Sequence, residues 1–94
     1  MAYEIVWSDA AWEDVRDVFA YLQEAHSDRI ANRFADELTE MLERLQRRPY
    51  IGKPHPSLSA VREVLIPPFN LLAYAVIRRE IILLNLTDTR RNRQ

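Results

Sequence analysis

Apolar residues recur at three- and four-residue spacing in two consecutive segments of the N-terminal half, the period of an amphipathic helix. The first segment predicts a helix from about Asp9 to Glu24, with Ser8 and Asp9 offering side-chain oxygens as caps. The second predicts a helix that is capped by Ser27 and ends before Pro49. Because the connection between them is short, we expect an antiparallel helical hairpin. Its expected core comprises the two apolar stripes: Ala11, Trp12, Val15, Phe19, Leu22, Ile30, Ala31, Phe34, Leu38, Met41, Leu42 and Leu45.

The chain on either side of the helical region follows the patterns of β-strands. Tyr3 to Trp7 alternates and is rich in residues that favour strands, whereas residues 49–56 contain three of the five prolines and the one glycine and are expected to form a loop. Three further strands are predicted at Val61–Ile66, Phe69–Ile77 and Ile81–Thr87, the last two joined by a tight turn at residues 78–80. The order β-α-α-β-β-β indicates a two-layer α+β domain, in which an antiparallel sheet carries the helical hairpin on one face.

Length and composition limit the classes of protein to which the chain can belong. The 94 residues suffice for a single domain, which we take to span residues 1–94 with residues 88–94 as a basic tail. With no cysteine and two histidines, the sequence predicts no disulfide, no metal site and no cofactor. No apolar run is long enough to span a bilayer and the first residues lack a signal-peptide pattern, so we expect a soluble, cytoplasmic protein that does not bind membranes.

The net charge of −1 conceals an uneven distribution. Residues 1–60 contain seven basic and eleven acidic residues, whereas residues 61–94 contain six arginines and three acidic residues. The acidic and basic parts of the chain are therefore different segments.

Several features together indicate a family. The first strand leads into Trp7-Ser8, followed by Ala11, Asp14 and Tyr21; the second helix closes with Leu42 and Leu45, followed by Pro49 and Gly52; later strands carry Arg62 and Tyr74; and the chain ends in Asp88-Thr89-Arg90-Arg91-Asn92. In this order the sequence resembles the ParE/RelE superfamily of bacterial type II toxins, from about Tyr3 to Asn92. The resemblance implies the predicted fold and a cognate antitoxin as partner.

The resemblance also implies one of two mechanisms. RelE-like members are ribosome-dependent mRNA endoribonucleases, which need groups that transfer protons as well as cations. ParE-like members inhibit DNA gyrase by binding. No Tyr, His, Lys or Cys follows Tyr74, and Arg cannot be deprotonated at ordinary pH, so the sequence favours the ParE-like function. The alternatives are the RelE-like endoribonuclease, acting on the ribosome and mRNA, and a degenerate toxin that only binds its antitoxin.

Candidate residues for the target-binding or active face are Arg62, Tyr74, Arg78, Arg79, Arg90 and Arg91, and no catalytic residue is assigned. Each has an alternative structural interpretation. Arg62 could pair with a carboxylate, Arg78 and Arg79 could belong to a solvated turn, and Tyr74 could be a packing residue. The histidines are expected at the surface. The acidic helix surface is either solvated or receives a basic antitoxin segment; it comprises Glu13, Asp14, Asp17, Asp36, Glu37 and Glu40.

Overall fold

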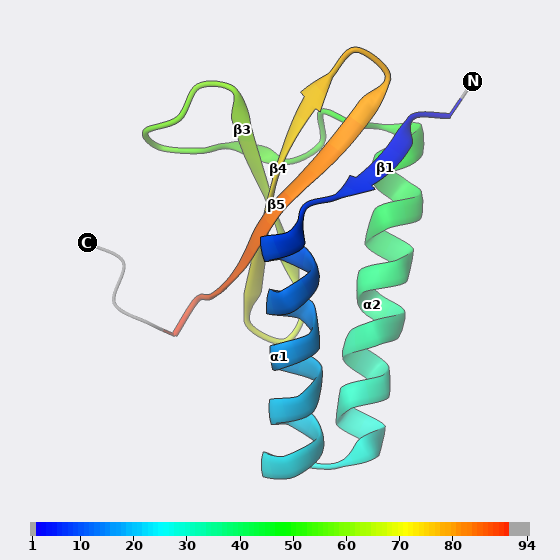
Figure 1. The fold of residues 1–94 in the computed structure, drawn as a ribbon, viewed down its shortest axis with the longest axis vertical. Coiled ribbons are helices and arrows are strands. Elements are labelled where there is room, and N and C mark those ends of the chain that lie inside the picture. Colours follow the sequence, from blue (N-terminus) through cyan, green and yellow to red (C-terminus); the bar gives the residue numbers. More distant parts are fainter. Residues whose placement is uncertain (1, 91–94) are drawn as a thin grey trace.

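Both predicted helices begin after a serine cap in the computed structural model, which describes residues 2–90. Helix α1 spans Asp9–Ala25, and the Ser8 side chain accepts a hydrogen bond from the Ala11 N–H. Helix α2 spans Asp28–Arg47, and the Ser27 side chain accepts one from the Ile30 N–H. These caps satisfy backbone N–H groups that have no partner within the helix. The two helices pack side by side as an antiparallel hairpin (Figure 1).

The sheet has five strands in the order β1-β5-β4-β3-β2. Strands β3, β4 and β5 form the predicted antiparallel meander. The sheet was expected to be antiparallel but is mixed, because β1 pairs in parallel with the first half of β5. The sequence could not show this, since alternation along a strand does not encode its direction. A short strand, β2, appears within the predicted loop. The strand bounds are β1 Glu4–Trp7, β2 Lys53–Pro54, β3 Val61–Ile66, β4 Asn70–Ile77 and β5 Glu80–Asp88.

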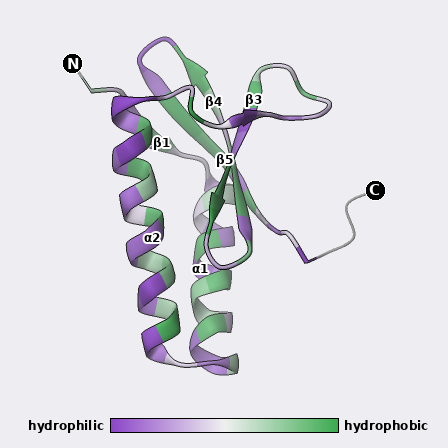
Figure 2. Ribbon diagram, turned by 180° about the vertical axis from the view of Figure 1, so that it is seen from behind, coloured by the Kyte–Doolittle hydropathy of each residue, from purple (hydrophilic) through white to green (hydrophobic). Residues whose placement is uncertain are grey.

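The core lies between the helical hairpin and one face of the sheet. Helix α1 packs against β5, and α2 packs against β3 and β1. Strands β4 and β5 are hydrophobic along most of their length (Figure 2), which agrees with their central position. The largest buried apolar side chains are Leu22, Phe34, Leu45, Ile66, Leu72, Tyr74, Ile81 and Leu83. No helix within residues 2–90 is long and apolar enough to cross a membrane.

The ladder between β4 and β5 has one irregularity. Ala73 pairs with Asn85 and Tyr74 pairs with Leu83, so Leu84 has no Cα partner in β4. This extra residue marks a bulge, and bulges bend a strand and redirect its side chains. Beyond the bulge, the C-terminal half of β5 lies beside α1 and no longer beside β1.

Candidate functional site

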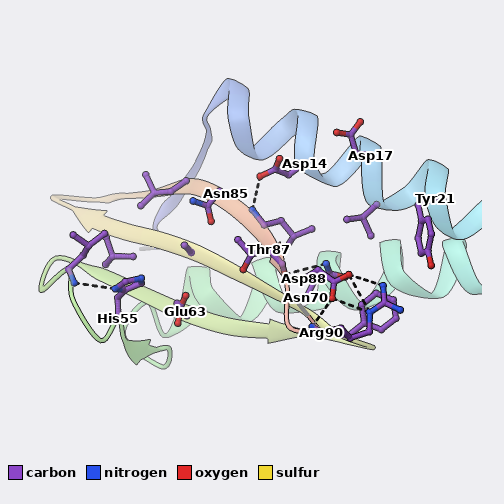
Figure 3. Close-up of a pocket in the computed structure, with 17 residues that line it drawn as sticks. Asp14, Asp17, Tyr21, His55, Glu63, Asn70, Asn85, Thr87, Asp88 and Arg90 are labelled. Atoms are coloured by element: carbon purple, nitrogen blue, oxygen red, sulfur yellow. Dashed lines mark hydrogen bonds and ion pairs between the residues drawn. The ribbon is translucent and has the colours of Figure 1, made fainter. Parts of the chain in front are cut away.

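A hollow of about 980 Å³ lies where α1, the loop after β2 and the strands β3 to β5 meet (Figure 3). Its described lining includes four carboxylate side chains, those of Asp14, Asp17, Glu63 and Asp88, and one guanidinium group, that of Arg90. We call this hollow the acidic pocket. Its negative charge favours a cationic ligand and repels the phosphate backbone of a nucleic acid.

Two side chains at the start of α1 fix one wall of the acidic pocket to the edge of β5. The Asp14 Oδ2 atom accepts a hydrogen bond from the Leu86 N–H at 2.9 Å. The Ser8 hydroxyl donates to the Leu84 carbonyl oxygen at 3.1 Å while it caps the helix. The helix thus satisfies backbone groups of β5 that β1 is too short to reach.

Arg90 lies at the mouth of the acidic pocket. Its Nη2 and Nε atoms donate to the Asp88 carboxylate at 2.7 and 3.1 Å, and this charge-assisted pair raises the pKa of the guanidinium above its usual value. The guanidinium carbon lies 3.6 Å from the centroid of the Phe69 ring and 6.0 Å from that of Tyr21. These contacts are the carboxylate fork and the aromatic faces that bind a planar guanidinium.

Asn70 is the one buried polar side chain of the described core, at 1% exposure, and it lines the acidic pocket. Its Nδ2 atom donates to the Thr87 carbonyl oxygen at 3.3 Å, which fixes the orientation of the amide because a carbonyl can only accept. The Asn70 Oδ1 atom has no donor among residues 2–90. A buried acceptor in this state is unusual and favours a ligand that brings an N–H group.

His55, predicted to be a surface residue, is half-buried on the other side of the acidic pocket. Its Nδ1 atom accepts hydrogen bonds from the Ser57 N–H at 3.0 Å and the Leu58 N–H at 3.1 Å. Acceptance at Nδ1 requires the neutral ring to carry its proton on Nε2. The ring therefore orders the loop that closes this side of the pocket.

Tyr74 and Arg62 hold a different loop. The Tyr74 side chain is completely buried; its hydroxyl donates to the Pro49 carbonyl oxygen at 2.7 Å and accepts from the Gly52 N–H at 3.0 Å. The Arg62 Nη1 atom donates to the Gly52 and Tyr50 carbonyl oxygens at 2.8 and 3.2 Å, and the guanidinium lies 5.3 Å from the Tyr50 ring centroid. We call these five residues the loop-anchor cluster.

Burial supports the alternative interpretation of Tyr74 as a packing residue. The side chain is a packing residue that anchors the loop after α2, and desolvation raises the pKa of its hydroxyl, whereas the Gly52 hydrogen bond and the Arg62 charge lower that pKa by less. Arg62 is half-buried and donates hydrogen bonds to backbone carbonyl oxygens. Gly52 fits because a Cβ atom there would lie 2.6 Å from the Tyr74 hydroxyl oxygen and 2.9 Å from the Glu63 carbonyl oxygen.

Arg78 and Arg79 form the exposed tip of the β4–β5 hairpin, which is hydrophilic in Figure 2. Arg78 has a φ of 57°, in the left-handed region that glycine adopts more easily. The Arg79 guanidinium carbon lies 5.1 Å from the Tyr3 ring centroid. The neighbouring Ile77 side chain is 56% exposed, so the tip combines two cations with an apolar residue.

The structure does not bring the candidate arginines together. Arg78 and Arg79 precede β5, whereas Arg90 follows it, and at 3.2–3.4 Å per residue the nine residues of β5 separate them by roughly 30 Å. Arg62 lies in the loop-anchor cluster, and Arg91 lies outside the described residues. Within residues 2–90 no group of three or more His, Cys, Asp or Glu residues could hold a metal ion. The described residues thus form no cationic centre that would stabilise a phosphorane.

An apolar groove lies along the helical hairpin; its apolar lining residues are Trp7, Trp12, Val15, Phe19, Phe34 and Leu38. Trp12 was included in the expected core, but the structure corrects this, because its side chain is 51% exposed. Its ring instead packs edge-on against Trp7, with centroids 5.3 Å apart. Exposed apolar surface of this kind is typical of a surface that binds a partner.

A family model for the ParE toxin of the parDE type II toxin–antitoxin system matches residues 5–93. No curated protein matches the sequence significantly. A solved structure of the chromosomal ParDE toxin–antitoxin system from P. aeruginosa is similar, with a TM-score of 0.77, 17% identity, and coverage of 93% of this chain and 96% of that chain.

Two further solved structures share the fold. The RelBE2 toxin–antitoxin complex from Mycobacterium tuberculosis has a TM-score of 0.66 at 17% identity, over 94% of this chain and 99% of that chain. The YoeB dimer from Staphylococcus aureus has a TM-score of 0.62 at 22% identity, over 90% and 94%. The resemblance to the ParE/RelE superfamily is thus confirmed.

Proposed function

The chain belongs to the ParE toxin family of type II toxin–antitoxin systems, and we propose that it inhibits DNA gyrase by binding and is neutralised by a cognate antitoxin. The sequence resemblance associates ParE-like members with gyrase. The charge of the acidic pocket is the observation that carries the choice against RNA cleavage, because its lining within residues 2–90 includes four carboxylates and one arginine, which is already paired.

The hairpin tip is the best-supported surface for contact with gyrase. Arg78, Arg79 and Ile77 are all exposed, and an apolar residue next to two cations suits an interface with an acidic protein surface. The left-handed backbone at Arg78 costs energy that glycine would avoid. An arginine at such a position supports a role for its side chain outside the fold.

The antitoxin is supported by the relatives and by the apolar groove. The solved structures from P. aeruginosa and M. tuberculosis are of toxin–antitoxin systems. The groove exposes Trp12 along the helical hairpin, where an amphipathic segment of a partner could cover it. The hairpin tip lies at the end of the sheet, so target and antitoxin would use different elements.

The test is gyrase supercoiling with the purified chain, with Arg78→Gly as the decisive variant. We expect the unsubstituted chain to block supercoiling or to trap cleaved DNA on gyrase. Arg78→Gly removes the charge but relaxes the backbone, so it should weaken inhibition by about three- to tenfold while the stability of the fold stays the same or rises. Arg33→Ala is the matched control, because Arg33 is exposed on α2.

Two results would contradict the proposal. Codon-periodic cleavage of mRNA on ribosomes, with gyrase unaffected, would establish the RelE-like endoribonuclease. Equal inhibition by Arg78→Gly and the unsubstituted chain would remove the hairpin tip from the interface.

A further inference from the structure

We propose that the acidic pocket binds an arginine side chain of the antitoxin, and that Arg90 occupies part of this arginine site in the isolated chain. This inference rests on the proposed function, because it takes the antitoxin as the partner. It concerns the opposite end of β5 from the hairpin tip, and it assigns the chemistry by which a partner would be recognised there.

The contacts of Arg90 show which chemical group the pocket mouth accepts. One ring face at 3.6 Å, a second ring at 6.0 Å and a carboxylate at 2.7 Å surround the guanidinium. Stacking on a ring requires a flat cation, and the carboxylate fork matches two parallel N–H groups. An ammonium group could satisfy the charge but neither the stacking nor the fork.

The interior of the pocket has capacity for a second cation. Asp14 and Asp17 of α1 both line the hollow, and the Asp14 Oδ2 atom accepts the hydrogen bond from the Leu86 N–H. The Arg90 side chain remains 51% exposed, so it sits at the mouth and does not fill a hollow of about 980 Å³. The pocket is thus wider than its own arginine requires.

The Asn70 side chain is a second observation, independent of the charges, that points to a ligand in the pocket. Its Oδ1 atom is buried and has no donor among the described residues, and Figure 3 places Asn70 beside Asp88 and Arg90. A guanidinium group carries five N–H donors and no acceptor, so it can serve a carboxylate and this amide oxygen together. Entry of a partner's guanidinium past Arg90 would give the oxygen the donor that it lacks.

The surroundings favour a peptide-borne arginine over a free small molecule. Tyr21 and Leu58, on opposite sides of the pocket, have side chains that are 44% and 56% exposed. Residues next to the inserted arginine would cover these apolar side chains. A nucleic acid would bring phosphates against four carboxylates.

The chain holds Arg90 close to the pocket. The Thr89 N–H and hydroxyl both donate to the Phe69 carbonyl oxygen, at 2.7 and 2.9 Å. Arg90 therefore competes with any incoming guanidinium for the Phe69 ring and the Asp88 carboxylate. Its removal should strengthen binding of a partner's arginine, the opposite of what a residue that itself contacts the partner would do.

The first experiment titrates the isotope-labelled full chain with N-acetyl-arginine methylamide and, separately, with N-acetyl-lysine methylamide, and follows the Asn70 side-chain amide by NMR. We expect saturable shifts with the arginine probe and binding about three- to tenfold weaker with the lysine probe. Arg90→Ala should tighten arginine binding. Asp17→Asn should weaken it, whereas Asp36→Asn, an exposed control on α2, should not.

The second experiment measures the dissociation constant of the reconstituted toxin–antitoxin complex. Asp17→Asn should raise it and Asp36→Asn should not, while gyrase inhibition by the free Asp17→Asn chain stays unchanged. Equal binding of both probes would reduce the pocket to an unspecific cation site, and weaker binding in Arg90→Ala would make Arg90 a direct contact; either overturns the proposal. Failure of gyrase inhibition in the unsubstituted chain would overturn the proposed target and leave the probe titration intact.

Discussion

Arg62 and Arg90 are both arginines that stack on an aromatic ring, yet their surroundings differ. Arg62 donates to two backbone carbonyl oxygens, and the hydroxyl beside it, that of Tyr74, both donates and accepts. Arg90 pairs with a side-chain carboxylate at the mouth of an open hollow, next to an amide oxygen that has no donor within residues 2–90. A guanidinium that donates to backbone carbonyl oxygens, as in Arg62, stabilises the fold. A guanidinium that pairs with a side-chain carboxylate next to an acceptor without a donor, as in Arg90, can be replaced by the guanidinium of a partner.

The largest effect on stability should follow from a substitution of Gly52 in the loop-anchor cluster. In Gly52→Ala, the new methyl group would approach the Tyr74 hydroxyl oxygen to 2.6 Å and the Glu63 carbonyl oxygen to 2.9 Å. Displacement of Tyr74 would leave buried groups unpaired, so we expect a loss of about 2–3 kcal/mol in the free energy of unfolding. Urea denaturation measures it, with Ser57→Ala in the exposed loop as a control. An unchanged midpoint would mean that the loop is not anchored as described.

A smaller effect should follow from removal of the Tyr74 hydroxyl alone. Tyr74→Phe leaves the Pro49 carbonyl oxygen and the Gly52 N–H without their partner and should cost about 1–2 kcal/mol at neutral pH.

The same variant should change the pH dependence. Burial raises the pKa of Tyr74 above its usual 10.0, so the folded state retains the proton longer than the unfolded state. The hydroxyl's contribution is therefore complete below about pH 10 and is lost as the pH rises through the folded-state pKa. Denaturation between pH 8 and 11.5 should show a steeper alkaline loss in the unsubstituted chain than in Tyr74→Phe, and parallel curves would contradict this burial.

Truncation of either arginine side chain should have the smallest effects on stability. Arg62→Ala removes two hydrogen bonds to loop carbonyl oxygens and should lower the free energy of unfolding by about 1 kcal/mol. Arg90→Ala should leave the thermal midpoint unchanged within error, because the side chain is half exposed and its pairing is local. If Arg90→Ala proves the more destabilising of the two, the division between a structural and an exchangeable arginine is wrong.

Local signals predicted most of the fold. The helix starts followed from Ser8 and Ser27, whose side chains satisfy the first N–H groups in the structure. Strand β3 was predicted with its observed bounds, because Pro67 ends its run of apolar residues. The parallel pairing of β1 was not predictable from alternation, since strand direction depends on how the whole chain returns to the sheet.

The site was less predictable because it depends on contacts between distant segments. Tyr74 follows a strand pattern, and nothing local shows that its hydroxyl reaches Pro49, 25 residues earlier. Trp12 fits the helical stripe but lies at its edge, where the sheet does not cover it. Two prolines precede Phe69 and Asn70 in the sequence, which predicted only that a strand starts there. Both residues line the acidic pocket because the pairing of β4 with β5 brings Arg90 beside them.

The contact between Asp14 and Leu86 affects whether two copies of this chain can associate through the edge of β5. Strand β5 is nine residues long, but β1 covers only Glu80 to Leu83, and the edge beyond would otherwise offer backbone groups to another molecule. The Asp14 carboxylate accepts a hydrogen bond from the Leu86 N–H, and the Ser8 hydroxyl donates one to the Leu84 carbonyl oxygen. A strand from a second copy could pair with this stretch only after both contacts break and α1 moves aside. The first turns of α1 therefore protect the free edge of β5 and limit edge-to-edge association of strands.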